Sequence, residues 1–177
     1  MAGDVDLIER RTPLVEDERL RSEALEAFAC LLGGERERSD LVRECCSIIA
    51  RTRKYALVSV CRGEPDGKVS MVAFAGEAQD YLRGIEVRWD DRAEGGGPIG
   101  RAIRRREPGI AKVSEASFTP WRDRARQFGI RCVVALPIAG PRDARYALAA
   151  YSTDARQVWG HDLSLLKQLA ADVAIAL

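Results

Sequence analysis

The sequence predicts an α+β domain in which helices pack on an antiparallel sheet. Three observations predict this class. Amphipathic helical segments lie towards both ends of the chain, β-type segments follow one another as hairpins, and short helical segments interrupt them in the middle. Such an order is typical of helices packed on an antiparallel sheet.

Two helices are expected before the first strand. Residues 16–32 place apolar side chains on one helical face, namely Leu20, Ala24, Leu25, Phe28, Ala29 and Leu32. Pro13 keeps a regular helix from starting earlier, and Gly33-Gly34 breaks it. Ser39 is the expected N-cap of the second helix, whose buried face carries Leu41, Val42, Cys45, Ile48 and Ile49.

The strands are predicted from apolar and β-branched runs. Residues 55–61 and 68–75 flank Glu64-Pro65-Asp66-Gly67, which is a strong turn signal, and they predict a hairpin. Residues 85–89 alternate apolar and polar side chains, which predicts a third strand with one solvated face. Further strands are expected at 110–113, 131–138 and 145–152, and helices at 99–106, 121–128 and 162–177.

Bulk composition limits the partners. The 177 residues are 46% hydrophobic and 31% charged, as in an ordinary globular domain with one appended element. A net charge of +1 creates no overall field that favours nucleic acid or an acidic membrane, and the chain lacks an apolar run long enough to span a bilayer. The acidic N-terminus and the odd number of cysteines, five, predict a cytoplasmic protein with reduced thiols.

Four segments carry a resemblance to a known family. They are YALVSVC with the following AFAG, GGGPIGRAIRRREPGIAKV, PWRDRARQFGIRCVVALPI, and ALAAYS with HDLSLLKQLAADVAIAL. In this order and spacing they resemble the GAF domain family from about Ser39 to the C-terminus, and most of all the GAF domains of bacterial multi-domain signalling proteins.

The resemblance implies a GAF-like (profilin-like or PAS-like) fold over residues 35–177. In this fold a central antiparallel sheet of five to six strands has a layer of terminal helices on one face and short capping helices on the other, with a pocket beneath the short helices. It implies that residues 1–34 form a signalling and dimerisation helix, which joins the last helix in a homodimer. Because the chain ends within a helical pattern, we expect either that the helix is cut short here or that it leads into a downstream output domain.

The expected pocket is described by eight residues. Its walls are predicted around Trp89, Ile99, Phe118, Trp121, Arg122 and Phe128, and its floor on the strand that carries Cys132 and Ala135. Packing of the aromatic side chains as ordinary core is the competing interpretation. Arg122 stands out in an arginine-rich segment because guanidinium groups bind carboxylates and phosphates. Most of these arginines are nevertheless expected on the solvated surface.

The cysteines allow two interpretations. None of the pairs has the spacing of a structural zinc site, and buried unreactive thiols are the expected state. The alternative is a thiolate, Cys132 above all, that ligates a haem or senses an oxidant. The sequence itself requires no cofactor.

The sequence therefore predicts a binding protein, not an enzyme. His161 is the only histidine and no serine lies in a G-x-S-x-G context, while Gly95-Gly96-Gly97-Pro98 lacks the ending of a phosphate loop. The predicted function is a sensory domain that binds an unidentified small molecule and relays its occupancy through the terminal helices. The alternatives are a structural homodimerisation module with a collapsed pocket and a thiol or haem redox sensor.

Overall fold

The computed structural model describes residues 37–141, 144–155 and 161–177, together with positions 19, 22, 23, 25–27, 29 and 30. Those isolated positions are helical, as predicted for residues 16–32. Leu25 and Ala27 are partly buried against the core, whereas Leu20, Ala24, Phe28 and Leu32 lie outside the described residues.

The elements follow the predicted order with one exception, a strand that does not form. They are α2 (Arg38–Arg53), β1 (Leu57–Gly63), β2 (Val69–Ala75), η1 (Gln79–Leu82), η2 (Ala93–Gly95), α3 (Pro98–Arg105), β3 (Gly109–Lys112), η3 (Ala116–Trp121), α4 (Arg122–Gln127), β4 (Cys132–Ala139), β5 (Arg145–Ser152) and α5 (His161–Ala176). Here η marks a 3₁₀ helix.

The five strands form one antiparallel sheet in the order β2-β1-β5-β4-β3. The predicted α+β architecture is therefore confirmed. Register between β1 and β2 is interrupted once: Met71 and Ala73 oppose Cys61 and Val60, so Val72 is an extra, bulged residue.

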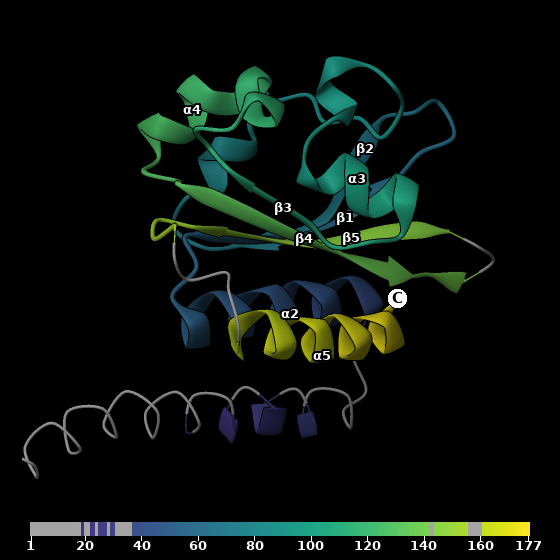
Figure 1. Cartoon of the computed structure of the whole chain (residues 1–177). Coiled ribbons are helices and arrows are strands. Elements are labelled where there is room, and N and C mark those ends of the chain that lie inside the picture. The colour runs from purple at the N-terminus through teal and green to yellow at the C-terminus, as the bar shows by residue number, and fades with distance from the viewer. Residues whose placement is uncertain are drawn as a thin grey trace, which may run out of the picture.

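Helices cover both faces of this sheet, as Figure 1 shows. The helices α2 and α5 lie side by side beneath it, and α3, α4 and the 3₁₀ segments lie above it. Because side chains alternate between the faces of a strand, each strand contributes to two separate cores. On β5, for example, Leu148 belongs to the core beside α2 and α5, and Tyr151 to the core beside α3 and α4.

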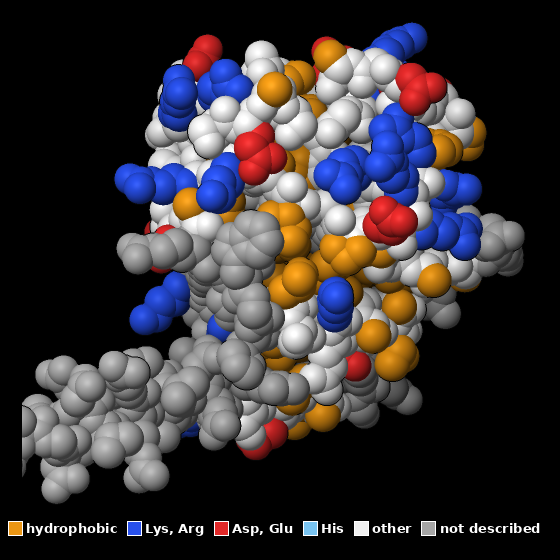
Figure 2. Space-filling model, viewed as in Figure 1, with side chains coloured by type: hydrophobic (Ala, Val, Ile, Leu, Met, Phe, Trp, Pro, Cys, Tyr) orange, Lys and Arg blue, Asp and Glu red, His pale blue; other side chains and the backbone are white. Residues whose placement is uncertain are grey.

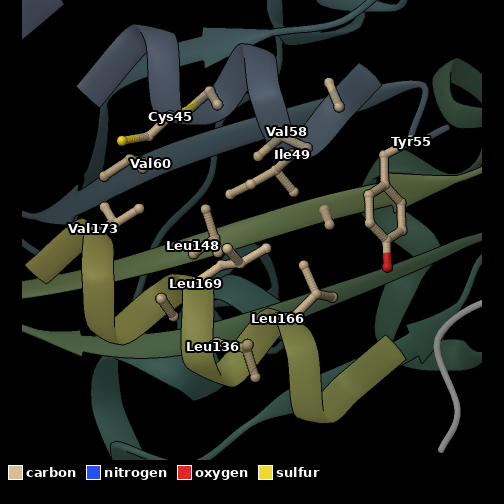
Figure 3. Packing of buried hydrophobic residues seen from close by; sticks show 14 of the residues in the cluster. Cys45, Ile49, Tyr55, Val58, Val60, Leu136, Leu148, Leu166, Leu169 and Val173 are labelled. Carbon is tan, nitrogen blue, oxygen red and sulfur yellow. The ribbon is translucent and has the colours of Figure 1, made fainter. Parts of the chain in front are cut away.

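Aliphatic side chains make up the core between the sheet and the two long helices. Figure 3 shows residues of both helices facing the strands across this layer: Ile49 from α2, Leu166, Leu169 and Val173 from α5, and Val58, Val60, Leu136 and Leu148 from the sheet. These contacts pack α2 and α5 against one face of the sheet.

The third predicted strand, residues 85–89, is wrong. This segment makes a single bridge, between Lys68 and Arg88, and is otherwise irregular. Arg88 is almost completely buried, and its guanidinium binds Asp90 at 2.6 Å and the carbonyl of Asp66 at 2.8 Å. The Glu86 carbonyl binds the indole of Trp121. The segment therefore touches only the first residue of β2, where Val69 N–H donates to the Val87 carbonyl, and its other contacts tie it to the loop at Asp66 and to Trp121.

The predicted N-cap of the second helix is also wrong, by two residues. The helix begins at Arg38, and its N-cap is Glu37, which makes no side-chain capping bond. The carbonyl of Glu37 accepts the first backbone bonds, from Asp40 and Leu41. No helix among the described residues is long and apolar enough to cross a membrane.

Candidate functional site

An apolar cavity lies where the sequence predicts a pocket, between the sheet and the short helices. Its lining is Tyr81, Val87, Gly97, Pro98, Ile99, Phe118, Trp121, Val133 and Tyr151. The volume of the cavity is about 20 Å³. One water needs roughly 10–15 Å³, while small-molecule sites measure about 300–1,000 Å³. In this structure the cavity has room for a molecule the size of a water.

Small residues on the sheet bring α3 close to it. On this face β4 and β5 present Ala135, Ala147 and Ala149, all completely buried. Ala102 and Ile103 of α3 are buried in the same core. The larger side chains Val133 and Tyr151 stand further along the same strands and form the floor of the cavity.

Trp121 forms the lid of the cavity. Its side chain is 5% exposed, and its indole N–H donates to the carbonyl of Glu86 at 2.8 Å. The ring meets Phe118 edge-on, with centroids 5.4 Å apart. It also lies directly against Gly97, where an added Cβ would come within 2.5 Å of its Cζ3. A glycine is therefore required for the ring to approach this closely.

Two arginines of α4 fasten the lid to neighbouring segments. Arg122 donates to the carbonyls of Val113 at 3.0 Å and Glu115 at 2.8 Å. Arg124 donates to the carbonyl of Tyr81 at 2.8 Å and lies over the ring of Phe128. Both guanidinium groups are thus occupied by the protein's own backbone, and neither lines the cavity.

The tyrosines of the cavity remain neutral. Tyr81 contacts both Tyr151 and Phe128 edge-on, at centroid distances of 5.5 and 6.1 Å. Burial raises the pKa of Tyr81 and of Tyr151 above the ordinary value of a phenol. The lining therefore presents apolar and uncharged groups only.

The eight predicted pocket residues have different fates. Ile99, Phe118 and Trp121 line the cavity, and Ala135 lies on the same face of the sheet. The other four do not line the cavity. Phe128 packs against Tyr81, and Arg122 binds backbone carbonyls. Trp89 donates to the Glu64 carbonyl and lies under the guanidinium of Arg145, and Cys132 faces the other core. Whether any of them contacts a ligand stays a prediction.

Cys132 is not on the pocket floor. It is buried in the core beside α2 and α5, with its thiol 3.7 Å from the carbonyl of Asp154. Side chains alternate along β4, so Val133 faces the cavity and Cys132 cannot. Burial, followed by the charge of Asp154, raises the pKa of Cys132 to about 11. This thiol is therefore protonated and cannot reach a group bound in the cavity.

Six lining residues were not among the predicted pocket residues: Tyr81, Val87, Gly97, Pro98, Val133 and Tyr151. The position of Tyr151 was predictable from the period of two along its strand. Tyr81 lies on a 3₁₀ helix, η1, that has no strong sequence signal. Val87 belongs to the segment that was expected to be a strand.

A larger hollow lies elsewhere, between the end of α2 and the turn after β2. This open cleft measures about 560 Å³ and is lined by Ser47, Ala50, Arg51, Lys54, Tyr55, Ala56, Gly76, Glu77, Gln79 and Thr153. Its charged side chains, Arg51, Lys54 and Glu77, are all exposed. We regard the smaller cavity as the site because its lining is apolar and because it lies where the sequence predicts a pocket, between the sheet and the short helices. The described residues hold no cluster of His, Cys, Asp and Glu fit for a metal ion.

Charged side chains surround the capping layer without entering the cavity. On the face shown in Figure 2, Lys and Arg lie over the half of the molecule that holds α3 and α4, with Asp and Glu among them. Arg104 pairs with Asp91 at 2.9 Å and also binds the carbonyl of Asp90. These contacts brace the loop before α3.

Solved structures with the same fold include sensors and one enzyme. The chain is similar to the phycocyanobilin-bound GAF domain of a cyanobacterial phytochrome, at 13% identity and a TM-score of 0.66 over 88% of this chain and 92% of that one. It is similar to free methionine-R-sulfoxide reductase from Neisseria meningitidis, at 14% identity and a TM-score of 0.68 over 88% and 89%. A methyl-accepting chemotaxis protein fragment is 19% identical, with a TM-score of 0.64 over 87% and 95%.

These identities show a shared fold alone. None of the curated proteins matches the sequence. The profile that describes the GAF domain, however, matches residues 35–177, which is most of the chain. This protein therefore belongs to the GAF domain family, a family of ligand-binding signalling domains.

Proposed function

We propose that the protein is a sensory domain that binds a small molecule at the cavity beneath Trp121 and relays its occupancy through α5. The observation that carries this proposal is the apolar cavity on the face of the sheet opposite α2 and α5. Ile99, Phe118 and Trp121 are the proposed contacts. The ligand would enlarge the cavity by displacing part of the lid.

A connection from the cavity to α5 supports the relay. Tyr151 lines the cavity one residue before β5 ends. The Ser152 hydroxyl binds the backbone N–H of Asp154 at 3.0 Å, and the Asp154 carbonyl meets Cys132 in the other core. A movement of Tyr151 would therefore displace the residues at the start of the connection to α5. A ligand can drive such a change only by binding one arrangement better than the other.

The similar structures support a ligand without naming this one. One of them holds phycocyanobilin, another holds the substrate of its enzyme, and a third belongs to a chemotaxis receptor. By analogy with such signalling proteins, we propose a cytoplasmic homodimer in which residues 1–34 and α5 pair, with an output domain downstream. Binding, not catalysis, is the proposed activity.

The size of the cavity favours a second candidate function. A volume of about 20 Å³ is what a structural homodimerisation module with a collapsed pocket would show. The two candidates differ in one measurable respect, because only a sensor gains stability from a ligand.

A thiol-based redox sensor has less support. Cys45, Cys46, Cys61 and Cys132 are buried, and burial raises their pKa values to about 11 or 12. Reactive cysteines have accessible sulfurs and lowered pKa values, so these four have the opposite properties.

Native mass spectrometry of the freshly purified chain tests the proposed function. The expected result is a retained small molecule, or a metabolite that raises the melting temperature and alters hydrogen exchange in α5. If no molecule is retained and no metabolite moves the melting temperature, the sensory proposal is rejected in favour of the structural module.

A further inference from the structure

The seat of the Trp121 ring has the features of a binding slot. Its floor is Gly97, which lacks a side chain at the point where the ring comes closest to the backbone. Phe118 forms one wall, at 5.4 Å between centroids. A polar acceptor, the carbonyl of Glu86, lies 2.8 Å from the indole nitrogen. The floor and the acceptor come from segments other than the one that carries Trp121.

We propose that this seat is a slot for a neutral planar aromatic ring with an N–H donor, and that Trp121 occupies it as the chain's own ligand until an outside ring displaces it. The inference rests on the proposed sensory function, for which it names the class of ligand. It also accounts for the small cavity, because the volume that a ligand needs is filled by the indole of Trp121.

The class of ligand follows from the groups around the slot. The described lining contains no charged side chain, and the nearby guanidinium groups of Arg122 and Arg124 are bonded to backbone carbonyls. An ionised ligand would lose its hydration without gaining a partner, which disfavours carboxylates and phosphates. The Glu86 carbonyl can only accept a hydrogen bond, so the ring that replaces Trp121 must donate one.

The same contacts make Trp121 replaceable. Within the described structure one side-chain hydrogen bond, to the Glu86 carbonyl, positions its indole, so an outside ring that donates the same bond and fills the same apolar space can take its place. The residual cavity of about 20 Å³ adjoins the ring. Apolar cavities of about 150 Å³ left by deletion of a large side chain bind benzene, so a vacated slot of this kind accepts a ring.

Removal of the internal ring tests the slot in the full chain. In Trp121→Ala, we expect indole to raise the melting temperature and to bind at least tenfold more tightly than it binds the wild-type protein, because its competitor is gone. 1-Methylindole, which lacks the N–H, should bind about tenfold more weakly than indole, equivalent to a hydrogen bond of about 1.4 kcal/mol. Indole-3-acetate should bind more weakly than indole because of its charge.

Trp89→Ala provides a matched control. Trp89 also donates its indole N–H to a backbone carbonyl, that of Glu64 at 2.8 Å, but it is half-buried and does not line the cavity. Indole should not restore stability to this variant. If Trp121→Ala fails to fold, Trp121→Phe keeps a ring in the slot without the N–H, and indole should still bind it more tightly than the wild-type protein.

The outcomes separate the slot from the proposed function. Equal binding of indole and 1-methylindole, or equal binding of indole by the wild-type protein and both Trp121 variants, overturns the slot. If a charged or non-aromatic molecule is retained by the wild-type protein and indole binds neither variant, the slot is rejected while the sensory function stands. If indole binds as expected but leaves hydrogen exchange in α5 unchanged in the wild-type protein, the slot stands and the relay is rejected.

Discussion

Arginine side chains near the cavity donate hydrogen bonds to the protein's own backbone carbonyls, and Arg122 shows this most clearly. Its guanidinium binds the carbonyls of Val113 and Glu115, which fastens α4 to the loop after β3. We expect Arg122→Lys to lower the free energy of unfolding by about 1–2 kcal/mol, because a single ammonium cannot reproduce the fork. Urea unfolding at constant m-value measures the change.

Arg126, on the same helix, provides the control for this prediction. Its side chain is 65% exposed and pairs loosely with Asp123 at 3.7 Å. Arg126→Lys should change the free energy of unfolding by less than about 0.5 kcal/mol. Equal effects of the two substitutions would contradict the assigned role of Arg122.

The buried thiols predict how stability depends on pH. Burial raises the pKa values of Cys45, Cys61 and Cys132 from 9.0 to about 11 and that of Cys46 to about 12. A raised pKa in the folded state stabilises the fold fully below pH 9, and that stability is lost as the pH rises through about 11. The free energy of unfolding should therefore fall between pH 9 and pH 11. Cys46→Ala should reduce the slope of that fall.

Thiol labelling at pH 8 checks the same assignment. Cys30 is exposed, whereas the other four cysteines are buried. A disulfide reagent should label one thiol rapidly in the folded chain and the remaining four only in denaturant. Rapid labelling of Cys132 in the folded protein would revive the redox interpretation.

For single residues, the sequence predicted which types of side chain line the cavity better than it predicted which face of a strand each side chain points to. Ile99, Phe118 and Trp121 were identified as cavity residues because aromatic and aliphatic side chains gathered on the capping segments. Cys132 was assigned to the wrong face because the phase of β4 depends on its register with β5, where Cys132 pairs with Ser152. The partners of Arg122 are backbone carbonyls of a distant loop, which a local pattern does not reveal.

Among the elements, α3 depends on close approach to the loop before it. An added Cβ at Gly100 would come within 2.2 Å of the Gly95 carbonyl oxygen and 2.6 Å of that of Arg88. Gly100→Ala should therefore lower the free energy of unfolding by about 1–3 kcal/mol through overpacking. Gly96→Ala is the matched control, since its Cβ would meet the Ala93 oxygen at an ordinary 3.4 Å. Similar melting temperatures for the two variants would refute this packing argument.

The edges of the sheet explain why one predicted element is missing. Residues 85–89 alternate in polarity, as a strand does, yet they pair only through the bridge between Lys68 and Arg88. Along β2 the bulge at Val72 interrupts the regular ladder, and bulged edges resist further pairing. On the other side Pro137 lies beyond the last pair of β3 with β4 and lacks an N–H to offer. Local alternation carries no information about these features.

Across the whole molecule, the sheet separates two cores of different character. The core beside α2 and α5 is mainly aliphatic, while the core beside α3 and α4 contains Tyr81, Phe118, Trp121 and Tyr151. The order of elements was predictable because it follows from periodicity along each segment, and the division into a helix layer and a capping layer was expected from the resemblance to the GAF family. The small volume of the cavity was not, because it depends on the final position of one side chain, Trp121.

The proposed homodimer predicts that Ile175 lies in the interface between the two copies. This side chain is 73% exposed on α5, although Val173 and Ala176 beside it are buried. If the terminal helices pair between two copies, Ile175→Glu should convert the dimer to a monomer at micromolar concentration, because a carboxylate would be buried without a partner. Size-exclusion chromatography with light scattering measures the mass.

Val72→Glu is the control, since Val72 is also an exposed aliphatic residue, at 39%, but lies on the edge strand β2 and not on α5. This variant should stay dimeric. Deletion of residues 1–34 should weaken the dimer in the same way as Ile175→Glu, because both changes remove part of one proposed surface. A deletion variant that remains fully dimeric would move the interface away from the N-terminal helix, and a monomeric wild-type protein would remove it altogether.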